Sequence, residues 1–499
     1  MYAAVAAYIM MFAPARAARQ EPGGQLEGDA LMSTDGSVGG TERLELESGS
    51  ARRGHTSSGR GLTRRGLALA GASGIVAACG SRESGAAGKP AASKAAGTVV
   101  FKTYLPGEPA RQAYEAAMVT WRERNPQIKV DQDFTADSTT HTASLTSQLA
   151  GGTAPDLAQV EFAWSVDFAL DGKFRALDDY MKQNRVAADE FFPGGTDFLR
   201  LNNKQYALPI TGHGPLLYYN RDLFQKEGVP LPPAQHTWRW NDLLTTAQRF
   251  TRRVAGKPEE SQWGLMVNFG MPYGVSSAIW QNGGAITDTR ENPTKTAMDG
   301  KAQDAVQWLV DLRYKHQVAP TPEEEKTLGN SPFVLGKCAM WLGPSFLTYT
   351  SLAPVKDFWW DVAFAPKGPD GTAAASTGTN HIAAFKDGKN PDAAWPLLYF
   401  FAAQEGARLR AQIQNIPPAN RKVFEEVWMK ATPAVRRETL RDTLAFTKDM
   451  WKGRGFGEWQ AAVNAPLVRA YDGGGSVSVP AAIVEANNQG TQVLLKQKK

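Results

Sequence analysis

From residue 98 the chain alternates between two spacings of apolar residues, one typical of strands and one typical of helices. Residues 98–104, 128–134 and 157–160 predict three strands, and residues 109–125 and 140–150 predict the helices between them. Strand, helix, strand, helix, strand in that order implies right-handed crossovers and a parallel sheet covered by helices on both faces. The expected fold class is therefore α/β.

The end of the third predicted strand is where a ligand is expected. Ligands of open parallel sheets bind beyond the carboxyl ends of the strands, and this strand ends at Val160. Glu161 or Asp167 there can accept hydrogen bonds from hydroxyl groups, and Trp164 offers a flat ring for stacking. The plainer alternatives are an exposed carboxylate at a helix start and a tryptophan packed in the core.

A second extended segment, residues 206–220, is interrupted by Gly212, Gly214 and Pro215. A strand-like run broken in this way is typical of a crossing between two lobes. Two lobes also suit the length, because residues 79–499 are too many for one compact core. The later part of the chain adds predicted helices at 243–253 and 302–314 and predicted strands at 264–267, 339–342 and 361–364.

Residues 63–80, T-R-R-G-L-A-L-A-G-A-S-G-I-V-A-A-C-G, predict an export signal. Two arginines precede an apolar run of the length a signal needs, about 7–15 residues, whereas a membrane span needs about 20. Residues 76–79, V-A-A-C, resemble a lipobox, in which Cys79 is lipidated, and T-R-R-G-L at 63–67 partly resembles the twin-arginine motif. Residues 63–78 are therefore expected to be a lipoprotein signal peptide. The alternative is a buried apolar helix that ends in an ordinary cysteine.

The segments on either side of this signal contain few residues that could form a core. Residues 79–97 are expected to be a flexible tether between a lipid anchor in a membrane and a folded part in water. Residues 1–62 are expected to be disordered or not translated, with translation beginning at Met32 or at an alternative start such as Val38.

Composition excludes several function classes. Hydrophobic residues make up 42% of the chain, and the net charge of +5 includes no basic block, so nucleic acid is not expected as a partner. The six histidines are scattered, so neither a metal site nor a cofactor is expected. Once Cys79 is lipidated, Cys338 is the remaining cysteine, and we expect a small buried residue rather than a nucleophile. No catalytic motif is present, and the 14 tryptophans are the informative excess.

The chain resembles the extracellular solute-binding proteins of ABC importers, in the maltose-binding-like family-1 group. No single matching segment is diagnostic, but they occur in family order behind a lipobox, and together they cover residues 97–499. The matching segments are A-P-D-L-A-Q-V at 154–160, Y-A-L-P at 206–209, L-L-Y-Y-N-R-D-L-F at 216–224, P-P-A-Q-H-T-W-R-W-N-D-L at 232–243, Q-N-G-G at 281–284, G-K-C-A-M-W-L-G-P-S-F at 336–346 and N-P-D-A-A-W-P-L-L-Y-F-F at 390–401.

This resemblance implies a two-lobe periplasmic-binding-protein-like fold with a hinge and an interlobe ligand cleft. The first lobe is expected to hold residues 97–213 and 346–402, and the second residues 216–342 and 406–499. The implied function is capture of a sugar or oligosaccharide by a monomeric lipoprotein, without catalysis, and delivery to ABC permease subunits. The implied location is the outer face of the cytoplasmic membrane, or the periplasm. The alternative is a secreted glycan-active enzyme, since glycoside hydrolysis needs only two suitably spaced carboxylates.

Further ligand contacts are expected near the crossings that the resemblance implies. The candidates are His213 in the hinge, Tyr273 and Trp280 before the Gly283-Gly284 turn, Phe346 at the second crossing, and Thr379 with Asn380 in a small polar segment. Maltose-type members carry a tryptophan directly after Gly-Pro, where this chain has Ser345, so the stacking geometry of that group is not expected. The alternatives are a solvated histidine, core tryptophans and a plain surface loop. Trp238, Trp240, Trp359 and Trp360 are expected to pack as strand, helix-start or core residues.

Overall fold

The computed structural model describes residues 95–431 and 435–497. The expectations for residues 1–62, for the signal over 63–78, for Cys79 and for the tether up to residue 94 lie outside these residues. Within the part of the chain that is described, no helix is both long enough and apolar enough to cross a membrane.

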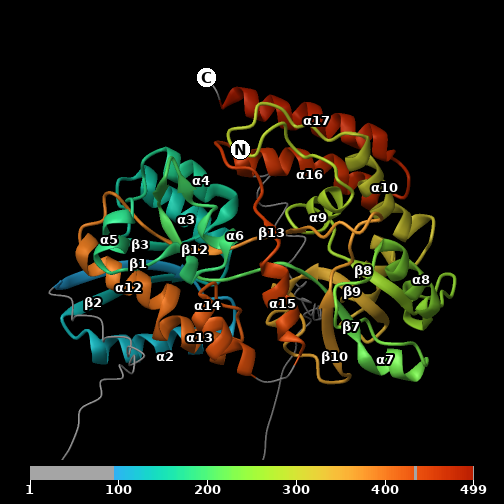
Figure 1. Cartoon of the computed structure of the whole chain (residues 1–499), viewed down its shortest axis with the longest axis horizontal. Coiled ribbons are helices and arrows are strands. Elements are labelled where there is room, and N and C mark those ends of the chain that lie inside the picture. Colours follow the sequence, from blue (N-terminus) through green and yellow to red (C-terminus); the bar gives the residue numbers. More distant parts are fainter. Residues whose placement is uncertain (1–94, 432–434, 498–499) are drawn as a thin grey trace, which may run out of the picture. The chain divides into compact units, whose positions relative to one another are not determined.

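The first sheet has five strands, in the order β2-β1-β3-β12-β6 (Figure 1). The three strands expected from the sequence pair in parallel, with Phe101 opposite Leu157 and Val99 opposite Val130. Strand β12 then pairs antiparallel with both β3 and β6, so the sheet is mixed rather than purely parallel. Its strands are β1 (Gly97–Tyr104), β2 (Ile128–Thr135), β3 (Leu157–Glu161), β6 (Ala207–Pro209) and β12 (Asn380–Ala384).

Helices cover both faces of this sheet, because neighbouring residues of a strand point to opposite sides. In β12, Ile382 and Ala384 pack in the core with α2 and α12, whereas Ala383 packs in the core with α3 and α4. Figure 1 shows these helices on the two sides of the sheet. The elements around it are α2 (Glu108–Arg124), α3 (Ser138–Ala150), α4 (Phe162–Leu170), α5 (Asp178–Gln183), η1 (Ala188–Glu190), α6 (Pro193–Thr196), β4 (Arg200–Leu201), β5 (Lys204–Gln205), α12 (Pro391–Ala403), α13 (Glu405–Ile413) and α14 (Arg421–Glu426).

The second sheet has four strands, in the order β10-β7-β9-β8. It contributes to a large core that also contains residues of α8, α9, α10, α16 and α17. Its elements are β7 (Pro215–Asn220), α7 (Arg221–Lys226), α8 (Trp240–Phe250), η2 (Pro258–Glu260), β8 (Trp263–Val267), α9 (Gly274–Gln281), α10 (Gly300–Tyr314), α11 (Pro322–Leu328), β9 (Cys338–Pro344), η3 (Ser345–Thr348), β10 (Trp360–Phe364), β11 (Ala375–Ser376), η4 (Trp428–Lys430), α15 (Arg437–Leu444), β13 (Thr447–Lys448), α16 (Phe456–Asp472) and α17 (Val479–Lys496).

The interrupted segment 206–220 passes from one sheet to the other, as its glycines and proline predict. Strand β6 belongs to the five-stranded sheet and β7 to the four-stranded sheet, with residues 210–214 between them. All six residues of β7 are buried, so its backbone polar groups need partners on both edges. Strand β9 pairs with one edge and β10 with the other.

This pairing of β10 differs from the lobe boundaries that the resemblance implies. Those boundaries put residues 346–402 in the first lobe, yet Val362 of β10 lies opposite Tyr218 of β7 in the second sheet. Ala402 at the end of α12 packs in the first sheet's core, as the implied boundary has it, but α13 beyond it also lies against α2 beside the first sheet. The chain therefore passes from one sheet to the other at more places than the implied lobe boundaries contain.

Candidate functional site

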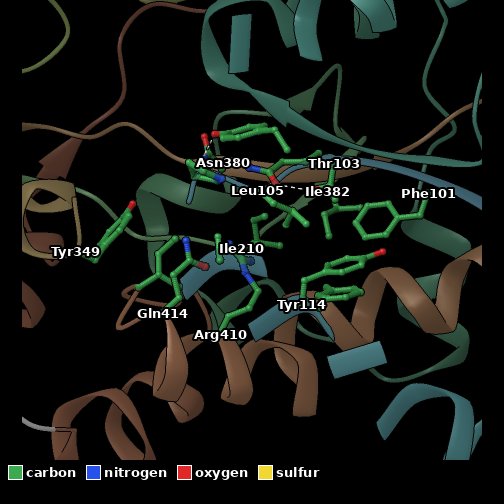
Figure 2. Close-up of a pocket in the computed structure, with 16 residues that line it drawn as sticks. Phe101, Thr103, Leu105, Tyr114, Ile210, Tyr349, Asn380, Ile382, Arg410 and Gln414 are labelled. Atoms are coloured by element: carbon green, nitrogen blue, oxygen red, sulfur yellow. Dashed lines mark hydrogen bonds between the residues drawn. The ribbon is translucent and has the colours of Figure 1, made fainter. Parts of the chain in front are cut away.

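A cavity of about 60 Å³ lies at the carboxyl ends of β1 and β3, and we call it the edge pocket. A second cavity in the described part of the chain has only about 10 Å³, which is the space that a single water molecule needs. The edge pocket is therefore the better candidate for an organic ligand. Its lining residues, shown in Figure 2, are Phe101, Thr103, Tyr104, Leu105, Pro106, Ala110, Tyr114, Gln159, Ile210, Tyr349, Asn380, Ile382, Phe401, Arg410, Gln414 and Ile416.

A chain of hydrogen bonds joins three strand ends beside the pocket. The hydroxyl of Tyr104 donates to Glu161 Oε1 at 2.9 Å, and Asn380 Nδ2 donates to Tyr104 Oη at 3.0 Å. The strand register causes this meeting, because Asn380 lies directly opposite Glu161 in the β12–β3 pair. Glu161 itself adjoins the pocket without lining it. The expected carboxylate at the strand end thus holds a tyrosine hydroxyl at the pocket wall.

Burial governs the protonation of this hydrogen-bonded pair. Burial raises the pKa of Glu161, and hydrogen bonds from Tyr104 and Ser138 partly oppose that rise. Burial and the Glu161 charge together raise the pKa of Tyr104 well above its ordinary value. The phenol therefore keeps its proton and uses it to donate a hydrogen bond to Glu161. Its oxygen also has a lone pair that can accept a hydrogen bond.

Aromatic rings form the apolar side of the edge pocket. Tyr114 of α2 stacks on Phe401 of α12 with ring centroids 5.5 Å apart and an interplanar angle of 8°. The ring centroid of Phe101 in β1 lies 5.3 Å from the ring centroid of Phe401. Figure 2 shows Tyr114 and Phe101 at one end of the pocket, and Asn380 and Tyr349 toward the other end. The pocket therefore offers apolar faces at one end and hydrogen-bonding groups at the other.

His213 lies behind the polar end of the pocket, in contact with residues of the second crossing. Its Nδ1 lies 3.2 Å from Ser345 Oγ, and its Nε2 lies 3.2 Å from the hydroxyl of Tyr349. Burial lowers the pKa of His213 to about 3, and the positive charge of Arg410 contributes. The imidazole is therefore neutral at physiological pH, and it positions Tyr349, which lines the pocket.

Two more of the expected residues pack beside His213. The ring of Phe346 meets the ring of His213 edge-on at 6.0 Å and the ring of Tyr273 at 5.8 Å. Tyr273 approaches the backbone so closely that a Cβ built on Gly378 would lie 2.2 Å from its hydroxyl oxygen. Only glycine allows that approach. The structure thus brings Glu161, Asn380, His213, Phe346 and Tyr273 into one neighbourhood.

Thr379 lines the small second cavity instead, together with the side chain of Asp449. Burial raises the pKa of Asp449 to about 7, and the nearby charges of Lys452 and Arg290 partly oppose the rise. The other residues around this cavity are Phe162, Phe198, Thr377 and Met450.

The two tryptophans expected in the site lie away from both cavities. Trp164 of α4 is partly buried against the core of the first sheet, and its ring lies edge-on to the ring of Phe168, with centroids 5.2 Å apart. Trp280 is partly buried against the core of the second sheet. Asp167, the alternative hydroxyl acceptor, accepts a 2.7 Å hydrogen bond from the backbone N–H of Gly455. Ligand contact by either tryptophan stays a prediction.

Several polar residues at these cavities were not expected from the sequence, and four of them bear on the site: Tyr104, Tyr349, Arg410 and Asp449. The rule that selected Glu161, that ligands lie at strand ends, would also have selected Tyr104, the last residue of β1. The other three carry no such signal, because helices and loops from distant parts of the chain bring them to the cavities.

Other chemistry is limited in the described part of the chain. No group of three or more His, Cys, Asp or Glu side chains there has the spacing to hold a metal ion. Cys338 is fully buried, and burial raises the pKa of its thiol far above the ordinary value, so the thiolate nucleophile does not form there. The expectation of a small buried residue is confirmed.

Comparison with known proteins identifies the family. The family model for bacterial extracellular solute-binding proteins matches residues 106–408. A Brucella abortus protein described only as a binding protein is 26% identical over 285 residues, which cover 56% of this chain and 66% of that protein. The mannitol-binding protein of Pseudomonas aeruginosa is 26% identical over 263 residues, which cover 50% of this chain and 58% of the relative. The chain therefore spans less than two thirds of the length of either relative.

Solved structures share the fold over a larger part of the chain. An ABC substrate-binding protein of Listeria monocytogenes in complex with cycloalternan has a TM-score of 0.67 at 22% identity, covering 79% of this chain and 98% of that chain. The cyclic alpha-maltosyl-1,6-maltose binding protein of Arthrobacter globiformis has a TM-score of 0.65 at 19% identity, and the match covers 80% of this chain and 100% of that chain. At these identities the likeness establishes the fold, which is the expected two-lobe periplasmic-binding-protein-like fold.

The family consists of binding proteins, so the alternative of a secreted glycan-active enzyme is not supported. The ordered motifs, the two-lobe fold and a family match over more than half of the chain agree. This chain belongs to the bacterial extracellular solute-binding protein family.

Proposed function

We propose that the protein captures a carbohydrate, a sugar or polyol, at the edge pocket and releases it unchanged. A carbohydrate presents apolar C–H faces together with a rim of hydroxyl groups. A matching site therefore needs apolar faces and a few fixed polar groups. The observation that carries the proposal is the fixed Tyr104 hydroxyl, held between Glu161 and Asn380, in a pocket that the Tyr114–Phe401 stack also lines.

The relatives support the same ligand class. One relative is named for binding mannitol, and another, from Bacillus subtilis, for binding arabinooligosaccharide. Two proteins of similar fold were solved with or named for cyclic or maltose-based saccharides. These names concern those proteins, and their shared chemistry is a dense set of hydroxyl groups.

The proposal includes delivery and anchoring. The protein is a monomer that presents its ligand to ABC permease subunits, held at the outer face of the membrane by lipid on Cys79. The family is extracellular, and the V-A-A-C segment before the tether supports lipid attachment there. Phe346 and Tyr273, which pack beside His213, are the further ligand contacts that we propose at this pocket. Ligand contact by Thr379, Trp164 and Trp280, which do not line the pocket, stays a prediction.

A thermal-shift screen against sugars, sugar acids, polyols and polyamines tests the ligand class. A ligand that binds only the native state raises the melting temperature, by an amount set by its concentration relative to Kd. We expect a carbohydrate to give the largest rise and calorimetry to confirm saturable binding, with no product formed during incubation. A rise produced only by polyamines would contradict the proposal.

Small-angle scattering tests the expected closure of the lobes. A ligand moves the lobes only through the part of its binding free energy that differs between the open and closed states. We expect a smaller radius of gyration at saturating ligand. Identical profiles with and without ligand would contradict closure while leaving binding intact.

A further inference from the structure

Arg410 on α13 presents an unpaired cation to the edge pocket. Figure 2 shows its side chain rising from the helix into the pocket, beside Gln414 one turn later. Its guanidinium makes no ion pair and no hydrogen bond with any residue that the structure describes. Burial lowers the pKa of Arg410, and the phenols of Tyr349 and Tyr104 are its neighbouring titratable groups.

Arg410 is half-buried, whereas the fully buried guanidinium groups in the described part of the chain, those of Arg313 and Arg437, have partners. Arg313 pairs with Asp472 at 2.7 Å and with Glu325 at 3.0 Å. Arg437 donates to the carbonyl of Trp428 at 2.8 Å and lies over its ring. A guanidinium without a partner carries a desolvation cost that these contacts offset elsewhere. The exception at Arg410 occurs where the side chain faces a cavity large enough for a ligand.

The pocket contains one positive charge and lacks a carboxylate of its own to neutralise it. Among the described residues that line it, Arg410 is the single cationic side chain and no acidic side chain is present. His213 behind Tyr349 is neutral. The adjoining Glu161 accepts the hydrogen bond that the Tyr104 hydroxyl donates. A ligand with one negative charge would supply the missing partner for Arg410.

The arrangement also sets the direction of such a ligand. Its anionic group belongs at Arg410, where Gln414 and Tyr349 can add hydrogen bonds, and its neutral hydroxyl groups belong near Tyr104 and Asn380. The reverse orientation is disfavoured because the Tyr104 hydroxyl already donates its hydrogen bond to Glu161, so that end of the pocket has fewer donors for a carboxylate. Arginine suits this role because its planar fork matches a carboxylate with two parallel hydrogen bonds.

We propose that the ligand is an acidic carbohydrate, a sugar bearing one carboxylate, and that Arg410 binds that carboxylate. This inference rests on the proposed function and narrows it from carbohydrates in general to sugar acids. A carboxylate is favoured over a phosphate ester because one arginine balances one charge, whereas a phosphate ester approaches two negative charges at neutral pH.

Isothermal titration with matched pairs of probes tests the proposal. Glucose is compared with glucuronate and with gluconate, and galactose with galacturonate, against the wild-type protein and Arg410→Gln. We expect the acid to bind at least about tenfold more tightly than its neutral partner, because hydrogen bonds between charged groups are the stronger ones. In Arg410→Gln the acid should lose that advantage, while the affinity for the neutral sugar stays within about threefold. Arg410→Lys, which keeps the charge but not the fork, should be intermediate.

The matched control is Arg408→Gln, which removes one positive charge from the same helix without touching the pocket. Arg408 pairs with Glu426 at 3.1 Å and does not line the cavity, so its substitution should leave the preference for the acid unchanged. Folding of Arg410→Gln is checked by its melting temperature, which we expect to equal or exceed that of the wild type, since no ion pair is lost.

The possible outcomes separate this inference from the proposed function. Equal affinities for acid and neutral sugar in the wild type, or parallel losses of both in Arg410→Gln, would overturn the role of Arg410 and leave carbohydrate binding standing. Tighter binding of glucose 6-phosphate than of glucuronate would overturn the carboxylate assignment. Absence of binding by every sugar, acidic or neutral, would overturn the proposed function together with this inference.

Discussion

The hydroxyl of Tyr104 donates a 2.9 Å hydrogen bond to Glu161 Oε1, and this bond joins the ends of two strands that pair in the same sheet. The two residues are far apart in the sequence, and the strand register aligns their carboxyl ends. Burial raises the pKa of both groups, and the bond fixes the position of the hydroxyl at the pocket wall.

Tyr104→Phe removes this hydroxyl without removing the ring. We expect carbohydrate affinity to fall about tenfold, because a fixed hydrogen-bonding group is lost and Asn380 and Glu161 lose their partner. Tyr114→Phe is the control in the same pocket, since the hydroxyl of Tyr114 is buried and has no partner. Calorimetry on both variants checks the prediction, and equal losses from the two substitutions would contradict it.

Trp164 and Trp280 are tested by comparing binding with stability. If either ring stacks on the ligand, its alanine variant should lose affinity by about tenfold or more. If it packs only in the core, as its location away from both cavities suggests, the variant should lose about 3–5 kcal/mol of unfolding free energy and bind normally once folded. Trp359→Ala is the control, because Trp359 is 72% exposed and its removal should change stability by less than about 0.5 kcal/mol.

Asp449→Asn should stabilise the protein by an amount that depends on pH. Burial raises the pKa of Asp449 to about 7, above the unfolded value of about 3.9, so the folded state binds a proton more tightly. In the wild type, the contribution of Asp449 to the unfolding free energy therefore falls as pH rises from about 4 to about 7, by up to about 1.4 kcal/mol per pH unit. The melting temperature of Asp449→Asn minus that of the wild type should rise through this window and level off above it.

The control for this titration is Asp442→Asn, which removes an exposed carboxylate nearby in the sequence. Its melting difference from the wild type should change little over the same pH range. If the melting temperature of Asp449→Asn minus that of the wild type stays constant from pH 4.5 to pH 8, the buried carboxylate does not titrate in this window.

Cys79→Ala tests the lipid anchor. If the V-A-A-C segment is a lipobox, the substitution should abolish metabolic labelling with a fatty acid and move the protein into the soluble fraction. Cys338→Ala is the control, since that thiol is fully buried and far from the signal in the sequence, and it should leave labelling unchanged. A Cys79→Ala protein that stays membrane-bound would refute lipid attachment at this residue.

Local pattern was sufficient for the elements of the first lobe. The three strands and two helices expected between residues 98 and 160 form with ends within two residues of the expected ones, because their apolar spacing and turn residues act over a few positions. The crossing at Gly212, Gly214 and Pro215 follows from the same short-range chemistry. The family resemblance, which rests on ordered motifs, extended this to the two-lobe fold.

Tertiary structure alone decided which distant residues meet. Nothing in the sequence around Arg410 or Tyr349 indicates a ligand, since an arginine on an amphipathic helix usually faces water. Trp359, expected to be a strand or core residue, is instead 72% exposed, because a tryptophan next to a strand end can point either way. The helix α13 reaches the end of β1 only after the chain has passed between the two sheets. The register of β12 against β3, which places Asn380 opposite Glu161, depends on packing across both faces of the sheet. The strands and helices are thus set by local sequence, and the ligand-binding groups by long-range packing.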